Sequence, residues 1–226
     1  MKYPNIKEGI FESRPNRFVA YVTVDGISEK CHVKNTGRLR ELLLPGAECY
    51  LCQSDNPNRS TRYDLVSVKR FDGVIVNIDS MAPNMVAKQY LKELFPEAKI
   101  KAEVTYQNSR FDFCIKEGEK TTFVEVKGVT LDDDGVARFP DAPTERGCKH
   151  LYELIDCKKR GYGAMIIFVV AMPGIRYVAP NRKTHPAFAD ALQAAKEAGV
   201  VLAAVECRVT LDEILPQKAL EVVPNG

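Results

Sequence analysis

The stretch Arg110–Lys127 reads RFDFCIKEGEKTTFVEVK and contains two apolar runs that each enclose one carboxylate. Alternate residues of a β-strand share a face, so Val124 and Val126 point to a core while Glu125 and Lys127 project together on the other side. Asp112 lies between Phe111 and Phe113, which predicts that it faces away from its apolar neighbours. If the strands over 110–115 and 121–126 pair as a hairpin, Asp112 meets Glu125.

This arrangement indicates metal chemistry. Two carboxylates at close range repel unless a cation or a proton lies between them. Mg²⁺ takes one or two carboxylates, keeps several waters and leaves room for phosphate oxygens. A lysine on the same face can position an attacking water or balance charge that develops on a phosphate. The pattern therefore predicts phosphodiester hydrolysis with Asp112 and Glu125 as ligands of Mg²⁺ or Mn²⁺ and Lys127 as the third catalytic residue.

The triplet is short, and the same residues occur on exposed strand faces as solvated or paired charges. Glu103 is a candidate third catalytic carboxylate, because it alternates with Lys101 and Thr105 on the preceding strand. The alternative for Glu103 is a charge on an edge strand, where charged side chains discourage pairing with other chains.

Outward from the hairpin, residues 81–226 predict a mixed α/β domain with a central sheet. The expected elements are a helix that begins near Pro83, a strand over 100–106, the two hairpin strands, a helix over 144–159, a strand over 164–171, a helix over 186–198 and a strand over 200–207. Residues 130–143 are rich in Asp, Gly and Pro and are expected to form a loop.

Residues 1–80 read differently, as short strands separated by turn residues. The candidate strands cover 18–24, 28–33, 48–53, 63–68 and 74–78. Five short strands within about 70 residues favour a small closed barrel, and the leading fold is a five-stranded oligonucleotide-binding (OB-like) barrel. We therefore divide the chain near residue 80 into two domains, 1–80 and 81–226.

Charge, apolar runs and cysteine content indicate which surroundings the protein is expected to occupy. The formal net charge is +2, with Lys and Arg against Asp and Glu at 12 to 10 in residues 1–80 and 20 to 20 in residues 81–226, so a basic surface must come from local clustering. The longest apolar run, 164–172, is less than half of a membrane span. The opening residues lack the apolar segment of a signal peptide, and seven scattered cysteines are typical of reduced thiols, so we expect a cytoplasmic protein without membrane segments.

The turn Lys34-Asn35-Thr36-Gly37-Arg38 combines cations with amide, hydroxyl and backbone donors, which can hold a DNA phosphate. Further cations expected on the same barrel surface are Arg17, Arg59 and Arg62. The alternative is an ordinary turn with Asn and Gly in left-handed conformations. Phe18 and Tyr21 could stack on bases, although aromatic residues of a small barrel more often belong to its core.

Thr144 is a candidate N-cap of the helix over 144–159, with Arg146 in the first turn. His150 and Glu153 lie one turn apart on this helix and share a face. Either could support the metal site by holding a water or orienting Lys127. The alternative is a pair of surface residues.

Ordered blocks along nearly the whole chain resemble the sugar fermentation stimulation protein family. They are Arg17-Phe18-Val19-Ala20, His32 to Leu39, Leu43-Leu44-Pro45-Gly46, Asn58-Arg59, Ser109 to Phe113, Val124 to Lys127, Phe139 to Thr144 with Arg146-Gly147, and His150-Leu151 with Glu153-Leu154. Two places depart from the family pattern, Arg40-Glu41 and Thr184-His185-Pro186, where the family often has an acidic residue before the proline. The resemblance implies an N-terminal oligonucleotide-binding barrel, a C-terminal domain similar to restriction endonucleases, DNA binding and, through the fold, metal-dependent nuclease activity.

Three functions remain after this reading. The first is a Mg²⁺-dependent deoxyribonuclease that uses Asp112, Glu125 and Lys127. The second is a non-catalytic DNA-binding regulatory protein, linked to sugar metabolism, that retains the nuclease-like fold. The third is RNA binding or processing, because small barrels also bind RNA. Strand preference is open, as is the choice between a monomer and a homodimer.

Overall fold

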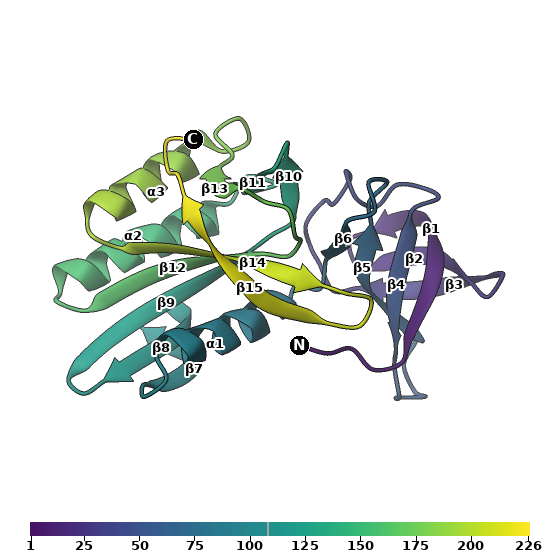
Figure 1. Ribbon diagram of the computed structural model, residues 1–226, viewed down its shortest axis with the longest axis horizontal. Helices are drawn as coiled ribbons and strands as arrows, with labels where there is room; N and C mark the ends of the chain where they lie inside the picture. The colour runs from purple at the N-terminus through teal and green to yellow at the C-terminus, as the bar shows by residue number, and fades with distance from the viewer. Residues whose placement is uncertain (108) are drawn as a thin grey trace.

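The computed structural model describes residues 1–107 and 109–226. These residues form two sheets with three helices (Figure 1). The first sheet contains β1 (Ile6–Asn16), β2 (Val19–Val24), β3 (Ile27–Val33), β4 (Glu48–Gln53), β5 (Tyr63–Lys69) and β6 (Ile75–Asn77). The second contains β7 (Lys99–Tyr106), β8 (Ser109–Glu117), β9 (Lys120–Val129), β10 (Leu131–Asp133), β11 (Val136–Phe139), β12 (Gly163–Val170), β13 (Tyr177–Pro180), β14 (Val201–Val209) and β15 (Ile214–Val222).

The first sheet closes on itself. Its order is β3-β2-β1-β4-β5-β6, and an additional parallel pairing of β3 with β5 joins its two sides. The closed ring therefore has five strands, β1 to β5, which confirms the expected five-stranded barrel. Its members differ from the prediction, because β1 is a barrel strand that sequence reasoning missed, and the segment near 75–77 is an added strand beside β5. Phe11, Val22, Leu51 and Leu65 fill the barrel core.

The second sheet is a nine-stranded mixed sheet in the order β10-β11-β13-β15-β14-β12-β9-β8-β7. Helix α1 (Ala82–Leu94) packs on one face, where Val86 and Leu91 meet Val124 and Ile167. Helices α2 (Glu145–Lys159) and α3 (Pro186–Glu197) cover the opposite face (Figure 1). This layered arrangement confirms the expected mixed α/β class.

Four strands of this sheet were not predicted. Residues 131–133 and 136–139 form the hairpin β10–β11 where a loop was expected, because three-residue pairing around Asp134-Gly135 leaves little apolar periodicity to detect. β13 is equally short. β15 contains Pro216 and charged residues, yet it lies between β13 and β14 and takes the proline at a register shift opposite Cys207.

The two domains contact each other at the backbone. The N–H group of Asn77, on β6, donates to the carbonyl of Ala171 at 2.9 Å. The first residues cross in the other direction, since the N–H of Tyr3 donates to the carbonyl of Asp212 at 2.7 Å (Figure 1). Residues 1–3 therefore lie against the C-terminal domain, and the barrel proper begins at β1. No helix in the described part of the chain is long and apolar enough to cross a membrane.

Candidate active site

The β8–β9 hairpin opens where the two carboxylates lie. Its antiparallel ladder extends to the pair Phe113↔Val124. Beyond that pair, a side-chain hydrogen bond takes the place of a backbone hydrogen bond between the strands. Oδ2 of Asp112 accepts from the N–H of Val126 at 2.8 Å. The carboxylate is thereby held against the strand that carries Glu125.

The strict alternation expected around Asp112 is wrong in detail. The ring of Phe111 packs on Phe123, with centroids 5.5 Å apart, on the face covered by α2. Phe113 packs with Val124 on the face covered by α1. Because Phe123 and Val124 are neighbours on opposite faces, Phe111 and Phe113 point to opposite faces too. The strand is distorted at Asp112, and this distortion turns its carboxylate toward Glu125.

Asp112 is half-buried and receives a second bond from the first turn of α1. Nδ2 of Asn84 donates to Oδ1 of Asp112 at 2.9 Å. Burial and the negative charge of Glu125 raise the pKa of Asp112 above its usual range, and the bonds from Val126 and Asn84 oppose that rise only partly. These surroundings therefore disfavour the ionised form of Asp112.

Glu125 is 3% exposed and holds its two oxygens in different surroundings. Oε1 accepts from Nζ of Lys127 at 2.6 Å and from Nδ1 of His150. Burial alone would raise the pKa of Glu125, but the bond from His150 and the charge of Lys127 lower it. Oε2 is buried without a hydrogen-bond partner among the described residues. A buried carboxylate oxygen without a partner is costly, so Oε2 is an acceptor available to a ligand that supplies positive charge.

Helix α2 supports this carboxylate. Thr144 caps its N-terminus, with Oγ1 accepting from the N–H of Gly147 at 3.0 Å, as predicted. Nε of Arg146 lies 3.4 Å from Nε2 of His150, which leaves Nδ1 of the ring to donate to Glu125. A chain of contacts therefore links Arg146, His150 and Glu125.

The carboxylates lie in a cleft of about 1030 Å³ between the barrel and the C-terminal domain. Its floor includes Asp112, Glu125 and Lys127, together with Asn84. The barrel side contributes Asn35, Thr36, Arg14, Arg17, Arg38 and Arg40, and the C-terminal domain contributes Arg138 and Arg146. Cations thus surround a small acidic centre, which suits a polyanion that must approach a metal ion.

These arginines differ in availability. Arg14 donates to the carbonyls of Arg17, Asn35, Gly37 and Arg38, so it braces the barrel loop. Asn35 also has a structural role, because its Oδ1 accepts from the N–H of Gly37 at 2.7 Å.

Arg17, Arg38 and Arg40 are exposed. Within residues 1–107 and 109–226 no acidic side chain forms an ion pair with any of these three.

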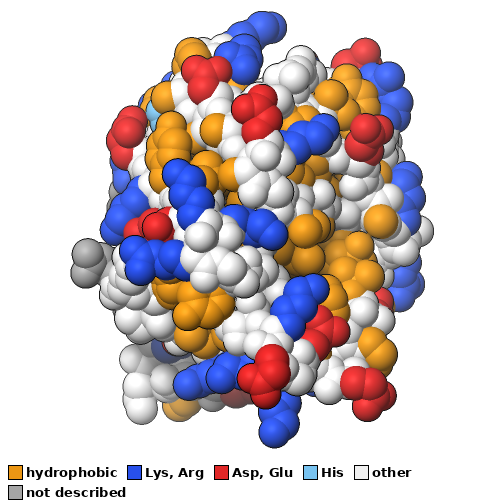
Figure 2. Space-filling view, turned by 90° about the vertical axis from the view of Figure 1, so that its left-hand side faces the viewer, with side chains coloured by type: hydrophobic (Ala, Val, Ile, Leu, Met, Phe, Trp, Pro, Cys, Tyr) orange, Lys and Arg blue, Asp and Glu red, His pale blue; other side chains and the backbone are white. Residues whose placement is uncertain are grey.

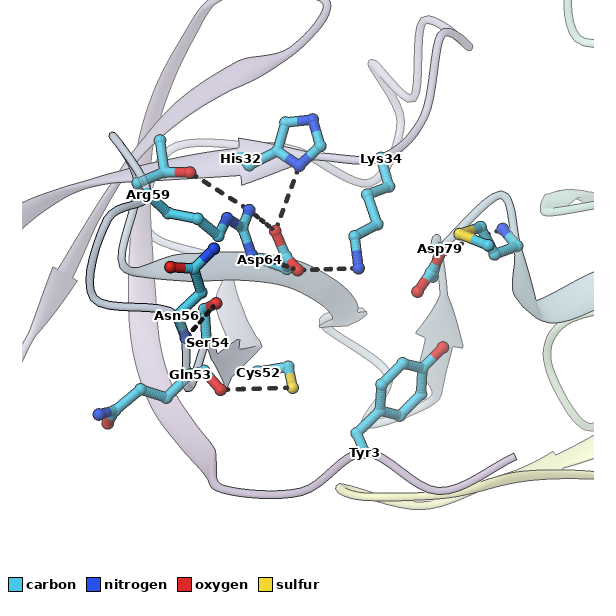
Figure 3. Close-up of polar contacts among 12 residues, drawn as sticks. Tyr3, His32, Lys34, Cys52, Gln53, Ser54, Asn56, Arg59, Asp64 and Asp79 are labelled. Carbon is cyan, nitrogen blue, oxygen red and sulfur yellow. Dashed lines mark hydrogen bonds and ion pairs between the residues drawn. The ribbon is translucent and has the colours of Figure 1, made fainter.

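Two predicted DNA-binding cations have other partners. Lys34 and Arg59 both contact the buried carboxylate of Asp64, at 2.8 and 2.5 Å, and His32 lies 3.2 Å from it (Figure 3). Burial would raise the pKa of Asp64, but the bonds from Arg59 and Lys34 lower it to about 2. Neither cation lines the cleft, and Arg62 lies over the ring of Tyr63 outside it.

Glu103 and Glu153 are not brought to the carboxylate pair. Glu103 is exposed on β7, an edge strand, and lies 3.6 Å from Arg110, as the alternative interpretation expected. Glu153 accepts from the hydroxyl of Ser109 at 2.5 Å and lies 3.6 Å from Lys149. The structure therefore gives no support to a third carboxylate from β7 or to a contact of Glu153 with Lys127.

Phe18 and Tyr21 are 55% and 38% exposed, so their expected place in the barrel core is wrong. Phe18 directly precedes β2, and Tyr21 lies on the solvent-facing side of this strand, whereas Ala20 and Val22 are fully buried. Phe18 follows Arg17 directly in the chain, which leaves an aromatic ring available beside a cleft arginine.

Sequence reasoning missed Asn84, Arg14, Arg40 and Asp141 as cleft residues. Arg40 had a signal, since it stands out as a departure from the family pattern. Asn84 and Asp141 lie near predicted helix starts. No local pattern shows that Asn84 contacts Asp112 or that Asp141 contacts the barrel loop.

The geometry suits a divalent cation bound by few protein ligands. The part of the chain that the structure describes has no group of three or more His, Cys, Asp or Glu side chains that could enclose a metal ion. Mg²⁺ does not need such a cage, because it usually retains several waters and binds through one or two carboxylates. The unpartnered Oε2 of Glu125 and the raised pKa of Asp112 fit that kind of ion.

Comparison with known proteins places both domains. Residues 13–78 match the family described as "SfsA N-terminal OB domain", and residues 80–213 match "Sugar fermentation stimulation protein RE domain". The chain belongs to the sugar fermentation stimulation protein family. Its members include a homolog from Desulfitobacterium hafniense (strain DSM 10664 / DCB-2), 53% identical over 95% of this chain and 94% of the relative. A homolog from Clostridium beijerinckii is 49% identical over 99% of this chain and the whole of the relative.

A solved structure of this family shares the fold over the full length. It is the SfsA protein of Pyrococcus furiosus in complex with Ca²⁺, which is 33% identical and superposes with a TM-score of 0.88. The match covers 99% of this chain and 98% of that protein. The barrel and the αβ domain are therefore features of the family.

Proposed function

We propose that this sugar fermentation stimulation protein is a DNA-binding, metal-dependent nuclease that hydrolyses phosphodiester bonds in the cleft between its two domains. The observation that carries the proposal is the pair of close carboxylates, Asp112 and Glu125, with one buried oxygen left without a partner. A binding protein without catalysis gains nothing from such a pair, because the mutual repulsion of a buried and a half-buried carboxylate destabilises the fold.

Asp112 and Glu125 would hold Mg²⁺ or Mn²⁺ between them. The two oxygens of Glu125 would have different roles. Oε1 already contacts Lys127 and His150, whereas Oε2 has no partner among the described residues and would bind the ion. When bound, the ion polarises a phosphodiester and lowers the pKa of a coordinated water. The crystallised relative from Pyrococcus furiosus contains Ca²⁺, which supports a site for a divalent cation in this family.

The surrounding side chains supply orientation and charge. Lys127 lies beside the carboxylates, where its ammonium group can bind the attacking water or the phosphate oxygens that gain negative charge. Hydrogen bonds from His150 and Asn84 hold the carboxylates of Glu125 and Asp112 in position. The arginines of the cleft would hold the sugar-phosphate backbone without reading its sequence.

DNA cleavage in the presence of Mg²⁺ or Mn²⁺ tests this proposal. We expect the wild-type protein to cut DNA and EDTA to stop the reaction. Asp112→Asn, Glu125→Gln and Lys127→Ala should each reduce the rate at least about 100-fold, because each removes charge from the reacting centre. Glu103→Gln is the matched control, because Glu103 is exposed on β7 and paired with Arg110.

The outcomes separate the candidate functions. Equal loss in the Glu103→Gln control would point to a general effect of lost charge, and activity that survives both Asp112→Asn and Glu125→Gln would refute the assignment. If the wild-type protein binds DNA with a steep salt dependence but never cuts it with either metal, the protein is a DNA-binding protein only. Faster cleavage of RNA than of DNA of matched length would show that the substrate is RNA.

A further inference from the structure

The burial of Glu125 in the cleft bears on which form of DNA can reach the carboxylates. A duplex is a wide ligand, because its major groove alone admits an α-helix about 10–12 Å across. Glu125 is 3% exposed, so the reacting phosphate must enter this confined space.

The cleft is also bridged. The barrel loop that carries Gly37 and Arg38 touches the C-terminal loop that carries Asp141, with the N–H of Arg38 3.4 Å from Oδ2 of that aspartate. The approach is close, since a Cβ atom at position 37 would lie 2.9 Å from the same oxygen and 2.9 Å from Oδ1 of Asn35. Arg14 holds the loop in place through bonds to the carbonyls of Gly37 and Arg38 at 2.9 and 3.0 Å. The two domains therefore close over one side of the cleft.

The arginines of the cleft that form no ion pair with any described residue could bind the phosphates of a single DNA strand. Arg17, Arg38 and Arg40 are exposed on the barrel side, and the carboxylate pair lies on the floor beneath them. By contrast, Figure 2 shows the end of the molecule away from the barrel, where Lys and Arg mix with Asp, Glu and apolar side chains. Barrels of this kind hold about 4–16 nucleotides of single-stranded nucleic acid.

We propose that the substrate strand is single-stranded DNA, either a free end or an unpaired segment, which passes beneath the bridged loop to reach Asp112 and Glu125. This inference rests on the proposed nuclease function. Arg38 and Arg40 bind its phosphates from the barrel side, and the contact between the loops of Gly37 and Asp141 keeps a duplex out of the floor of the cleft.

Binding without hydrolysis tests the inference separately from catalysis. The probe is a fluorescein-labelled DNA strand of about 12 nucleotides, a length within the usual range for such barrels. The same sequence is presented as a blunt duplex and as single-stranded RNA, with the Asp112→Asn protein in Ca²⁺ so that nothing is cut. We expect fluorescence anisotropy to give at least tenfold tighter binding of the single-stranded DNA than of the duplex.

The double variant Arg38→Ala with Arg40→Ala should weaken single-strand binding and lower the slope of log affinity against log salt by about 1.4, or about 0.7 for each lost phosphate contact. Arg182→Ala is the control, because Arg182 is exposed, pairs with Asp190 and does not line the cleft. Duplex binding as tight as single-strand binding would overturn the inference, as would tighter binding of RNA. Metal-dependent cutting of duplex DNA at the same rate would overturn it while leaving the nuclease proposal intact.

Discussion

Asp112 and Glu125 differ in how the protein satisfies their oxygens. Both oxygens of Asp112 accept hydrogen bonds, from Asn84 and from the N–H of Val126. Glu125 shares one oxygen between Lys127 and His150 and leaves the other without a partner among the described residues. The pair therefore keeps its place in the fold without a metal ion, at the cost of one uncompensated negative charge. Such a cost is typical of a site arranged for a ligand.

The raised pKa of Asp112 predicts how stability depends on pH. A carboxyl group whose pKa is higher in the folded state than in the unfolded state stabilises the fold while it is protonated, and this contribution is lost as the pH rises through the folded pKa. At neutral pH the ionised Asp112 should therefore destabilise the metal-free protein.

Asp112→Asn should raise the melting midpoint of the metal-free protein at pH 7 by a few degrees, because the neutral amide removes the repulsion from Glu125. The amide oxygen can still accept from Val126. Thermal unfolding at pH 7 and at pH 4 measures the effect, which should shrink at the lower pH because the wild-type carboxyl gains its proton. A midpoint below that of the wild type at pH 7 would contradict the assigned direction.

At the residue scale, the sequence was sufficient to indicate which side chains converge but gave the wrong geometry for how they do so. Alternation around Phe111 and Phe113 predicted a regular strand, whereas their rings lie on opposite faces of the sheet. The local distortion depends on Asp112 bonding to Val126 on the next strand. A contact between strands of this kind leaves no periodic signal along either one.

At the scale of elements, helix α2 positions His150 and Arg146 from a defined starting point. Thr144 ends the preceding loop and accepts from the N–H of Gly147, so the first turn of the helix begins at a fixed place. Phe188 of α3 packs close to this turn, since a Cβ atom at Gly147 would lie 3.2 Å from its ring. The orientation of α2 toward β9 therefore depends on both its cap and its packing.

Thr144→Ala should lower the free energy of unfolding by about 1 kcal/mol, because the N–H of Gly147 loses its acceptor. In a chain of this size that corresponds to a fall of about 2–4 °C in the melting midpoint. Thr144→Ser keeps the hydroxyl and should remain close to the wild type. A loss equal to that of the alanine variant would show that the methyl group, and not the cap, stabilises this end of α2.

Elements with strong patterns were predictable, and those stabilised by their neighbours were not. The apolar run of β12 and the capped helix α2 appear where expected. β15 is long but carries Pro216 and charged residues, and it is a strand because β13 and β14 pair with both of its edges. β1 was missed because charged residues, Gly9 and Pro15 interrupt its few apolar residues, although it completes the barrel.

At the scale of the whole molecule, the cleft exists because two domains meet. Its lining joins Arg17 of the barrel to Glu125 of the C-terminal sheet and to Arg146 of α2, which are far apart in the chain. Backbone bonds from Asn77 and Tyr3 to the C-terminal domain hold the two units together. The sequence could indicate both folds, but the direction from which the barrel faces the carboxylates depends on this interface, so the roles of Arg14, Arg40 and Asp141 were not predictable.

A calorimetric titration of the metal-free protein with Mn²⁺ tests the central claim most directly. We predict one ion bound per chain in the wild type, with affinity that falls as the pH drops because Asp112 must release its proton to bind. Asp112→Asn and Glu125→Gln should each weaken binding at least about tenfold, whereas Glu103→Gln should bind like the wild type. Unchanged Mn²⁺ affinity in both the Asp112→Asn and the Glu125→Gln proteins would contradict a metal site at these two carboxylates.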